Sequence, residues 1–289
     1  MTPPTADVAT LTAVYAGVDP EHLHEALESV RAQTTPPAEV LVVADGPLTD
    51  PLETVIADFA DHLPLTVLRL PVRSGAGPAR QAGLRAASAA WVAVVDADDV
   101  SLPERLERQV EAAERADLSL LGTAVEEFDT DTAQVLGTRA FATSHEQLAR
   151  QLRTRNAFNH PSVLMRRERA LAVGGYQDLP YLEDYDLCAR IGASGGRMGN
   201  LDEVLVRFRG GAPSQRRRRE PGWFAAEVRL QRNLRSYGLI RAWQVVGNLV
   251  VRSGYRLMPP GADRLAYRLV FLSRLPRRRA STRAGARSA

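Results

Sequence analysis

The stretch W-V-A-V-V-D-A-D-D-V, residues 91–100, decides the fold of this chain, because a short apolar run ends abruptly in three carboxylates. A run of this length that is rich in β-branched valine predicts a buried strand. Asp96, Asp98 and Asp99 follow directly after it. Open α/β sheets bind ligands at the C-terminal ends of their strands, so the three aspartates mark a candidate functional site.

The chemistry of this acidic cluster points to a cation. Like-charged groups in such proximity repel each other unless a positive charge lies between them. Mg²⁺ and Mn²⁺ take oxygen ligands and commonly bridge one or two carboxylates to the phosphates of a substrate. The cluster therefore predicts a metal–diphosphate site with Mg²⁺ or Mn²⁺ as the cofactor. The alternative from these residues is a solvated acidic turn after a buried strand.

Strands and helices alternate on both sides of this stretch. Upstream, the apolar patterns predict strands over residues 8–15, 39–44 and 65–70 and helices over residues 20–33 and 50–62, and a small-residue loop at 75–84 opens a third helix. Downstream, they predict helices over residues 104–116, 144–153 (capped by Ser144) and 182–190 and strands over residues 119–128 and 201–208. Residues 158–166 are predicted to be a turn followed by a strand. This alternation predicts an α/β fold, with a mostly parallel sheet flanked by helices.

Composition limits the class of protein. A length of 289 residues fits one large domain or one domain with an appendage. The one cysteine, Cys188, excludes an internal disulfide and fits a reducing compartment. The N-terminus lacks the layout of a signal peptide, and no apolar run approaches the ~20 residues of a membrane span. We therefore expect a cytoplasmic protein.

Charge is distributed unevenly along the chain. Residues 1–130 hold 22 acidic residues and 8 Arg, whereas residues 131–289 hold 12 acidic residues and 29 Arg. Residues 239–275 mix apolar side chains with Arg, which predicts a basic amphipathic helical tail from residue 221 onward, with a disordered end. Such segments can lie at an anionic membrane surface, on the inner face of the cell membrane here. The alternative is that these helices pack on the rest of the protein.

Short motifs in a fixed order carry a resemblance. They are E-A-L-E-S-V-R-A-Q-T (25–34), V-V-A-D-G-P-L-T-D (42–50), G-P-A-R-Q-A-G-L (77–84), V-D-A-D-D-V-S-L-P-E-R-L-E-R-Q (95–109), H-P-S-V-L-M-R-R (160–167), V-G-G-Y (173–176) and L-E-D-Y-D-L (182–187), after a first strand that ends in Tyr15. Together they resemble the family 2 glycosyltransferases with the GT-A fold. The D-G-P-L-T variant is similar to transferases of bacterial exopolysaccharide and amylovoran assembly, and the resemblance spans nearly the whole chain.

The resemblance implies an architecture and a reaction. It implies a Rossmann-like GT-A nucleotide-sugar transferase domain over residues 1–220, followed by the basic helical extension over residues 221–289. The reaction would be inverting, metal-dependent transfer of a sugar from a nucleotide-diphosphate sugar to a glycan or lipid-linked acceptor in cell-surface polysaccharide synthesis. Chain-extending relatives carry membrane spans, so we expect a non-processive enzyme.

The resemblance also assigns roles to the acidic residues. Asp184 matches the catalytic base, and Asp96 and Asp98 match the D-x-D pair, with Asp98 as the direct metal ligand. Asp45 matches the aspartate that contacts the nucleotide base. A carboxylate there accepts a hydrogen bond from a base N–H, so we expect UDP or dTDP rather than ADP. The physics agrees, because a sugar hydroxyl needs a proton acceptor and the departing diphosphate needs a cation.

Four further residues complete the predicted site. We expect Tyr15, Arg80 and Asp96 to take part in nucleotide binding, and Glu183 and His160 to lie beside the donor sugar or the acceptor. From the residues alone, Arg80 could be a solvated helix residue, His160 a packed turn residue, and the acidic pair at 183–184 simply favourable first-turn charges. Asp45 could merely cap a turn.

The chain departs from the family pattern at several positions. It has Ala44 before Asp45 where many relatives have an acid, Ala16 after the first strand and Gln81 in place of Asn. No histidine follows His160, so the late histidine that ligates metal in some GT-A enzymes is absent or replaced.

Two other function classes remain open from the sequence. A D-x-D after a strand also fits a haloacid-dehalogenase-like phosphatase, but that motif belongs near the first strand and needs a lysine, which this chain lacks. The run of four Arg at 216–219 fits a non-catalytic protein that binds an anionic polymer. Because no aromatic residues interleave with the run, we expect no nucleic acid partner.

Overall fold

A computed structural model describes residues 5–130, 132–210 and 222–256. The strands are β1 (Ala6–Val14), β2 (Pro37–Asp45), β3 (Leu65–Leu70), β4 (Trp91–Val94), β5 (Val100–Ser101), β6 (Leu120–Asp129), β7 (Val135–Arg139), β8 (Leu164–Arg166) and β9 (Met198–Gly210). The helices are α1 (Pro20–Arg31), α2 (Asp50–Ala60), α3 (Ala76–Ala86), α4 (Arg105–Arg115), α5 (His145–Gln151), the 3₁₀ turn η1 (His160–Ser162), α6 (Arg167–Ala172), α7 (Glu183–Ala193), α9 (Trp223–Ser236) and α10 (Ala242–Arg256).

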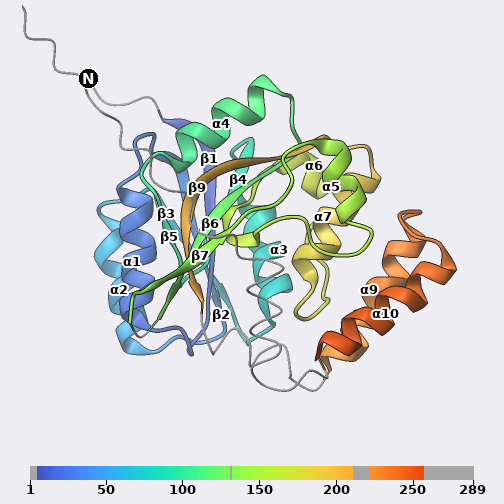
Figure 1. Cartoon of the computed structure of the whole chain (residues 1–289). Coiled ribbons are helices and arrows are strands. Elements are labelled where there is room, and N and C mark those ends of the chain that lie inside the picture. Colours follow the sequence, from blue (N-terminus) through green and yellow to red (C-terminus); the bar gives the residue numbers. More distant parts are fainter. Residues whose placement is uncertain (1–4, 131, 211–221, 257–289) are drawn as a thin grey trace, which may run out of the picture.

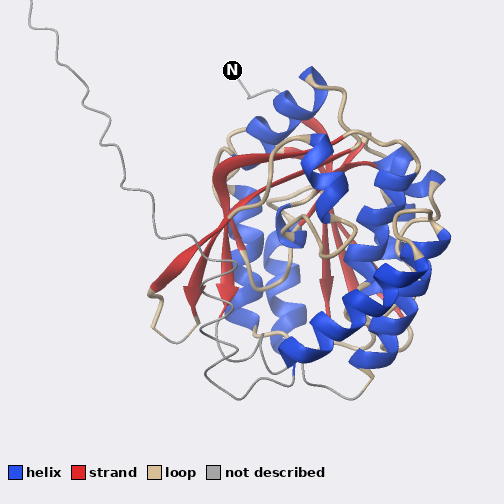
Figure 2. Cartoon of the chain, turned by 45° about the vertical axis from the view of Figure 1, so that its right-hand side comes forward, coloured by secondary structure: helices blue, strands red, loops and turns tan. Residues whose placement is uncertain are grey.

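One sheet organises the molecule, in the order β3-β2-β1-β4-β8-β6-β9-β5, with β7 paired to β6 (Figure 1). The pairs β3-β2, β2-β1, β1-β4 and β6-β9 are parallel, as the alternating pattern predicts. The short strand β8 runs antiparallel to both β4 and β6, so it joins the two parallel parts. Figure 2 shows helices on both faces of the sheet.

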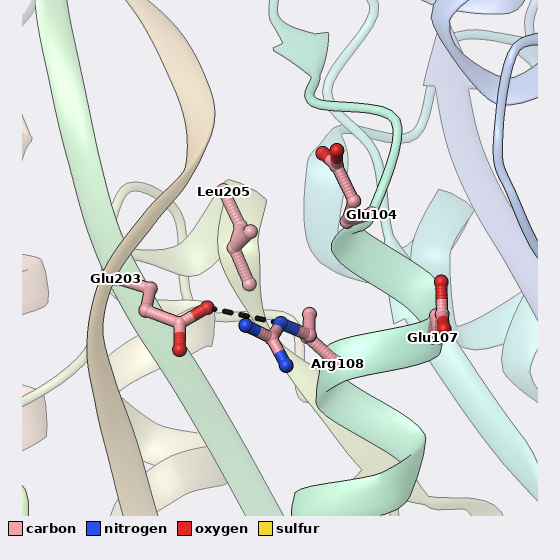
Figure 3. A pocket seen from close by; sticks show the side chains of 5 residues that line it. All are labelled: Glu104, Glu107, Arg108, Glu203 and Leu205. Atoms are coloured by element: carbon pink, nitrogen blue, oxygen red, sulfur yellow. Dashed lines mark ion pairs between the residues drawn. The ribbon is translucent and has the colours of Figure 1, made fainter. Parts of the chain in front are cut away.

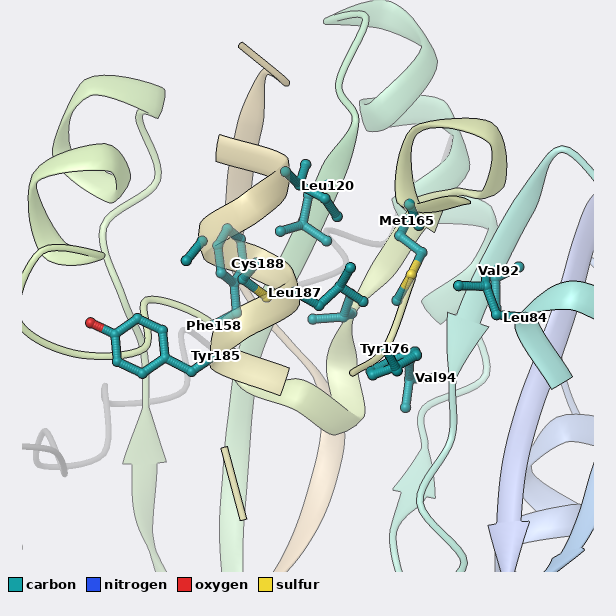
Figure 4. Packing of buried hydrophobic residues seen from close by; sticks show 14 of the residues in the cluster. Leu84, Val92, Val94, Leu120, Phe158, Met165, Tyr176, Tyr185, Leu187 and Cys188 are labelled. Atoms are coloured by element: carbon teal, nitrogen blue, oxygen red, sulfur yellow. The ribbon is translucent and has the colours of Figure 1, made fainter. Parts of the chain in front are cut away.

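The side-chain period of two in β2 separates two cores. Val40 and Val42 face α1 and α2, whereas Leu41 and Val43 face α3 and belong to the core that α6 and α7 also enter. All four side chains are buried, because helices cover both faces of this strand as they do in parallel sheets. On the second face, Cys188 packs as a core residue with its neighbours, as Figure 4 shows.

Helix starts follow their local sequence signals unequally. At α1, the Asp19 side chain accepts a hydrogen bond from the Glu21 amide at 2.9 Å, and Pro20 occupies the first helical position. At α5, Ser144 is the N-cap residue, as predicted, but its side chain makes no capping hydrogen bond. The capping interaction expected there is therefore wrong, although the helix begins where predicted.

Three elements escape sequence reading, namely β5, β7 and α6. A strand of two residues and a helix of six residues are too short to display a period, and β7 contains a glycine. Tertiary partners create the two strands: β9 pairs with β5, and β6 pairs with β7.

The chain beyond β9 returns to the main core. Leu230 and Leu234 of α9 are fully buried in the cluster that contains α3 and α7, and α10 packs on α9. None of the described helices is long and apolar enough to cross a bilayer. The predicted disordered end of the tail lies outside the described residues.

Candidate active site

The three aspartates lie between β4 and β5, at the C-terminal end of β4 as predicted. Asp99 is buried; its Oδ1 accepts a hydrogen bond from the Arg209 amide at 2.8 Å, while its Oδ2 has no hydrogen-bond partner among the described residues. Burial, together with the charges of Asp98 and Asp96, raises the pKa of Asp99 well above its usual range. The cluster thus holds crowded carboxylates at a strand end.

Arg80 of α3 links this cluster to α7. Its Nη2 lies 2.7 Å from Asp96 Oδ1, and its Nη1 lies 2.8 Å from Glu183 Oε1. Burial opposes the guanidinium charge, but the two carboxylates outweigh it and raise the pKa of Arg80. The predicted diphosphate contact of Arg80 stays a prediction, whereas its solvated alternative is wrong because the side chain is largely buried.

Asp184 lies next to Glu183 in the first turn of α7. Its Oδ2 accepts a hydrogen bond from Asn156 Nδ2 at 2.9 Å, and its Oδ1 accepts one from the Tyr185 amide at 2.6 Å. Burial, then the charge of Glu183, raises the pKa of Asp184 to about 7. A carboxylate with such a pKa can accept a proton efficiently near neutral pH.

His160 lies in η1, beside this group. Its Nε2 is 2.9 Å from the Tyr176 hydroxyl, and the two rings meet edge to face. Burial and the charge of Arg80 lower the pKa of His160 to about 3, so the imidazole is neutral near pH 7. Gln81 positions Tyr176 in turn, because the Tyr176 backbone amide donates a hydrogen bond to Gln81 Oε1 at 2.7 Å.

Gly175 makes this contact possible. Its φ is +65°, which favours glycine, and a Cβ atom there would lie 2.0 Å from Gln81 Oε1. The glutamine at position 81, a departure from the family pattern, therefore connects α3 to the V-G-G-Y turn.

A second group of residues lies at the end of β2. Asp45 is buried, and its two oxygens accept hydrogen bonds from the amides of Ser74, at 2.6 Å, and Gly75, at 2.9 Å. Next to this loop, the Arg73 guanidinium lies 4.3 Å from the centre of the Tyr15 ring. Asp45 thus shapes the loop before α3, and its predicted contact with a nucleotide base stays a prediction.

Comparison with known proteins identifies the family. The profile described as Glycosyl transferase family 2 matches residues 12–174. This chain belongs to glycosyl transferase family 2. It is 35% identical over 257 residues to the amylovoran biosynthesis glycosyltransferase AmsE of Erwinia amylovora. The matched region covers 87% of this chain and 94% of that protein.

Two further relatives of this family 2 glycosyltransferase extend the comparison. The Escherichia coli UDP-Gal:alpha-D-GlcNAc-diphosphoundecaprenol beta-1,3-galactosyltransferase is 28% identical over 272 residues, with 94% of this chain and 98% of that protein covered. The crystal structure of S. aureus TarS 1-349 in complex with UDP-GlcNAc matches with a TM-score of 0.67 at 17% identity, covering 89% of this chain and 75% of that chain. The predicted family and GT-A fold are therefore confirmed. The chain is a glycosyltransferase, and the two alternatives, a phosphatase and a non-catalytic binding protein, are wrong.

Four residues of the site were missed by sequence reasoning: Arg73, Asn156, Tyr176 and Arg209. Tyr176 lies within the V-G-G-Y motif, so a signal was present. Asn156 and Arg209 have no local signal, because their contacts with Asp184 and Asp99 join distant segments.

The residues at the end of β4 fit a divalent cation in part. No group of three or more His, Cys, Asp or Glu within residues 5–130, 132–210 and 222–256 is arranged to hold a metal ion. The Asp99 Oδ2 atom without a hydrogen-bond partner, however, lies in a cluster of carboxylates whose repulsion contributes to the raised pKa of Asp99, and a bound cation would relieve that repulsion. One or two carboxylates suffice for Mg²⁺ when water and substrate phosphates complete its coordination.

A hollow of about 280 Å³ lies between α4 and β9, lined by Glu104, Glu107, Arg108, Glu203 and Leu205 (Figure 3). The Arg108–Glu203 ion pair crosses it at 3.4 Å. None of these residues belongs to the predicted site.

Proposed function

We propose that this family 2 glycosyltransferase is a non-processive hexosyltransferase, which transfers a sugar from a nucleotide-diphosphate sugar to a glycan or lipid-linked acceptor with inversion. The observation that carries the proposal is the Arg80 bridge, because it joins the predicted diphosphate end, at Asp96, to the Glu183–Asp184 pair. The names of the relatives support a role in cell-surface polysaccharide synthesis, since one acts in amylovoran biosynthesis and another on a diphosphoundecaprenol-linked sugar.

Asp184 is the proposed base of this reaction. It would take the proton from the acceptor hydroxyl as the oxygen attacks the anomeric carbon, and a single displacement without an enzyme nucleophile inverts the configuration. Asn156 orients the carboxylate for this step through its 2.9 Å hydrogen bond. Glu183 and the neutral imidazole of His160 would face the donor sugar or the acceptor.

Asp98, with Asp96, would hold Mg²⁺ or Mn²⁺, which when bound stabilises the charge of the departing nucleoside diphosphate. Tyr15 and Asp45 would contact the nucleotide base, and UDP or dTDP is the favoured donor nucleotide. Both Asp45 oxygens already accept an amide hydrogen bond, but each carboxylate oxygen can accept a second one. The UDP-GlcNAc in the TarS complex supports a uridine donor.

We place the enzyme in the cytoplasm, peripheral to the inner face of the membrane. Residues 1–220 would carry the transfer reaction, and residues 221–289 would be the basic extension. This division is proposed from function and not from packing, because α9, which begins after residue 221, packs in the same core as α7.

A donor screen on the full chain tests the proposal. UDP-sugars and dTDP-sugars with Mn²⁺ should raise the melting temperature more than ADP-sugars, since a ligand stabilises only the folded state that binds it. Asp184→Asn should keep this shift and lose turnover roughly 10²–10⁴-fold, the usual worth of a positioned base. Glu203→Gln, in the hollow beside α4, is the control for both readouts. Normal turnover of Asp184→Asn, or full activity in excess EDTA, would contradict the proposed mechanism.

A further inference from the structure

The outer face of α10 is apolar and exposed. Trp243, Val246, Val250 and Val251 are 70%, 61%, 67% and 72% exposed, respectively. The spacing of 243, 246 and 250 places these residues on one face of the helix. Because large hydrophobic side chains gathered on one surface mark an interaction site more often than scattered ones do, this face needs a partner.

The side of α10 that faces the protein makes polar contacts, beside the partly buried Val245 and Leu249. Asn248 Nδ2 donates to the Arg153 carbonyl at 2.8 Å and to Gln231 Oε1 at 2.9 Å. Arg252 donates to the Thr154 carbonyl at 3.1 Å and lies 2.7 Å from the carboxylate of Glu227. The inner side of the helix therefore combines polar contacts with apolar packing, and a second apolar stripe is left on the outer side.

This orientation is held firmly. Glu227 is fully buried, and Arg252 is the cation that balances it. Rotating α10 to bury Trp243 would pull Arg252 away from the buried Glu227 carboxylate, and breaking such an ion pair is unfavourable. The apolar face is thus presented outward by a buried ion pair.

Charge selects the occupant of this face. Residues 222–289 contain 14 Arg and 2 acidic residues, and Arg232, Arg235 and Arg241 are exposed on or beside the α9–α10 pair. Residues 257–289 hold 8 Arg and 1 Asp, so they and a second copy of the chain would both bring positive charge against positive charge. A nucleic acid would match the Arg but offers nothing to an exposed apolar stripe. An anionic bilayer matches both, through lipid phosphates and the acyl boundary.

We propose that the outer face of α10 (Trp243, Val246, Val250 and Val251) docks into the interface of an anionic lipid bilayer, with neighbouring Arg at the lipid phosphates. This inference rests on the proposed location at the membrane and names the surface that makes the contact. It also gives α9 a role, since α9 connects the docked helix to α7 and so to Asp184. A lipid-linked acceptor would then reach the enzyme at the surface that holds it.

Flotation of the full chain tests this surface. Vesicles of equal parts phosphatidylcholine and phosphatidylglycerol should carry the protein upward at low salt, vesicles of phosphatidylcholine should carry little, and high salt should release it. The triple variant Trp243→Ser, Val246→Ser, Val250→Ser should lower the partition coefficient at least tenfold. Val72→Ser, which replaces an exposed valine outside α9 and α10, should not change it.

Two controls separate this inference from the proposed function. Release of nucleoside diphosphate without vesicles should be the same in the triple variant and the parent, because α10 contains none of the proposed site residues. Tryptophan emission should shift to the blue when anionic vesicles are added, and Trp243→Phe should remove most of that shift. Equal flotation of parent and triple variant, or no flotation of the parent on anionic vesicles at low salt, overturns the α10 surface whether or not turnover is found.

Discussion

The raised pKa of the Asp184 carboxyl affects both the stability of the fold and the proposed proton transfer. Its ordinary pKa of 3.8 rises to about 7 in the folded chain because the group is buried and lies beside Glu183. A raised carboxyl pKa means that the folded protein holds a proton that the unfolded chain releases. The associated stability is complete at low pH and is lost as the pH rises through about 7.

This sign leads to a paired prediction. Turnover should increase as the pH rises through about 7, because the base must be ionised. Asp184→Asn should be more stable than the parent at pH values above that point and should lose this advantage in acid, as measured by urea unfolding across pH. Asp58→Asn, which removes an exposed carboxylate of α2, is the control. A parent whose turnover is flat between mildly acidic and mildly alkaline pH would contradict the role of Asp184.

Arg80 gives a second test at the residue scale. Arg80→Met leaves Asp96 and Glu183 without their shared cation, and breaking a buried pair of this kind costs about 3 kcal/mol of unfolding free energy. The matched control is Arg31→Met. Its 2.6 Å ion pair with Glu28 is exposed to solvent and screened by it, so its loss should cost far less unfolding free energy than the loss of Arg80. Similar losses in the two variants would show that the Arg80 bridge contributes little to the fold.

At the scale of elements, Asp186 joins α7 to α9. It is fully buried, and it accepts hydrogen bonds from Arg190 at 2.8 Å, Asn233 at 2.9 Å and the Tyr237 hydroxyl at 2.9 Å. Because α7 begins with Glu183 and Asp184, the packing of α9 against this junction helps to position the proposed base.

The junction predicts a graded series. Asp186→Ala should cost about 3–5 kcal/mol, because it leaves the buried Arg190 without its carboxylate. Tyr237→Phe removes one hydrogen bond and should cost about 1 kcal/mol. Denaturant unfolding of both variants measures the series. If Tyr237→Phe, which keeps the ring, were as damaging as Asp186→Ala, the Tyr237 hydroxyl would outweigh the Asp186–Arg190 ion pair.

For the whole molecule, the question is whether α9 unfolds with the sheet or before it. Leu230 and Leu234 lie in the cluster that includes β1, β4 and α7, so we expect one cooperative unit. Native-state hydrogen exchange should then give the amides of α9 the same opening free energy as those of α7. Markedly weaker protection of α9 would instead support an independent tail that begins near residue 221.

Local patterns were sufficient for the framework of this protein. The periods of buried valine and leucine predicted β1 to β4 and their helices, since hydrophobic alternation needs only a few consecutive residues. The motifs that carry the family resemblance are likewise contiguous, and they brought Asp96, Asp98 and the Glu183–Asp184 pair to attention as separate acidic groups.

Only the tertiary structure decided how these groups meet. Arg80 contacts Asp96, 16 residues away, and Glu183, 103 residues away, and no local period encodes such a pairing. The same holds for Asn156 on Asp184, for β5 and β7, and for the outward apolar face of α10. The direction in which α10 faces depends on the ion pair between its Arg252 and Glu227 of α9, a contact between two helices that no local period encodes.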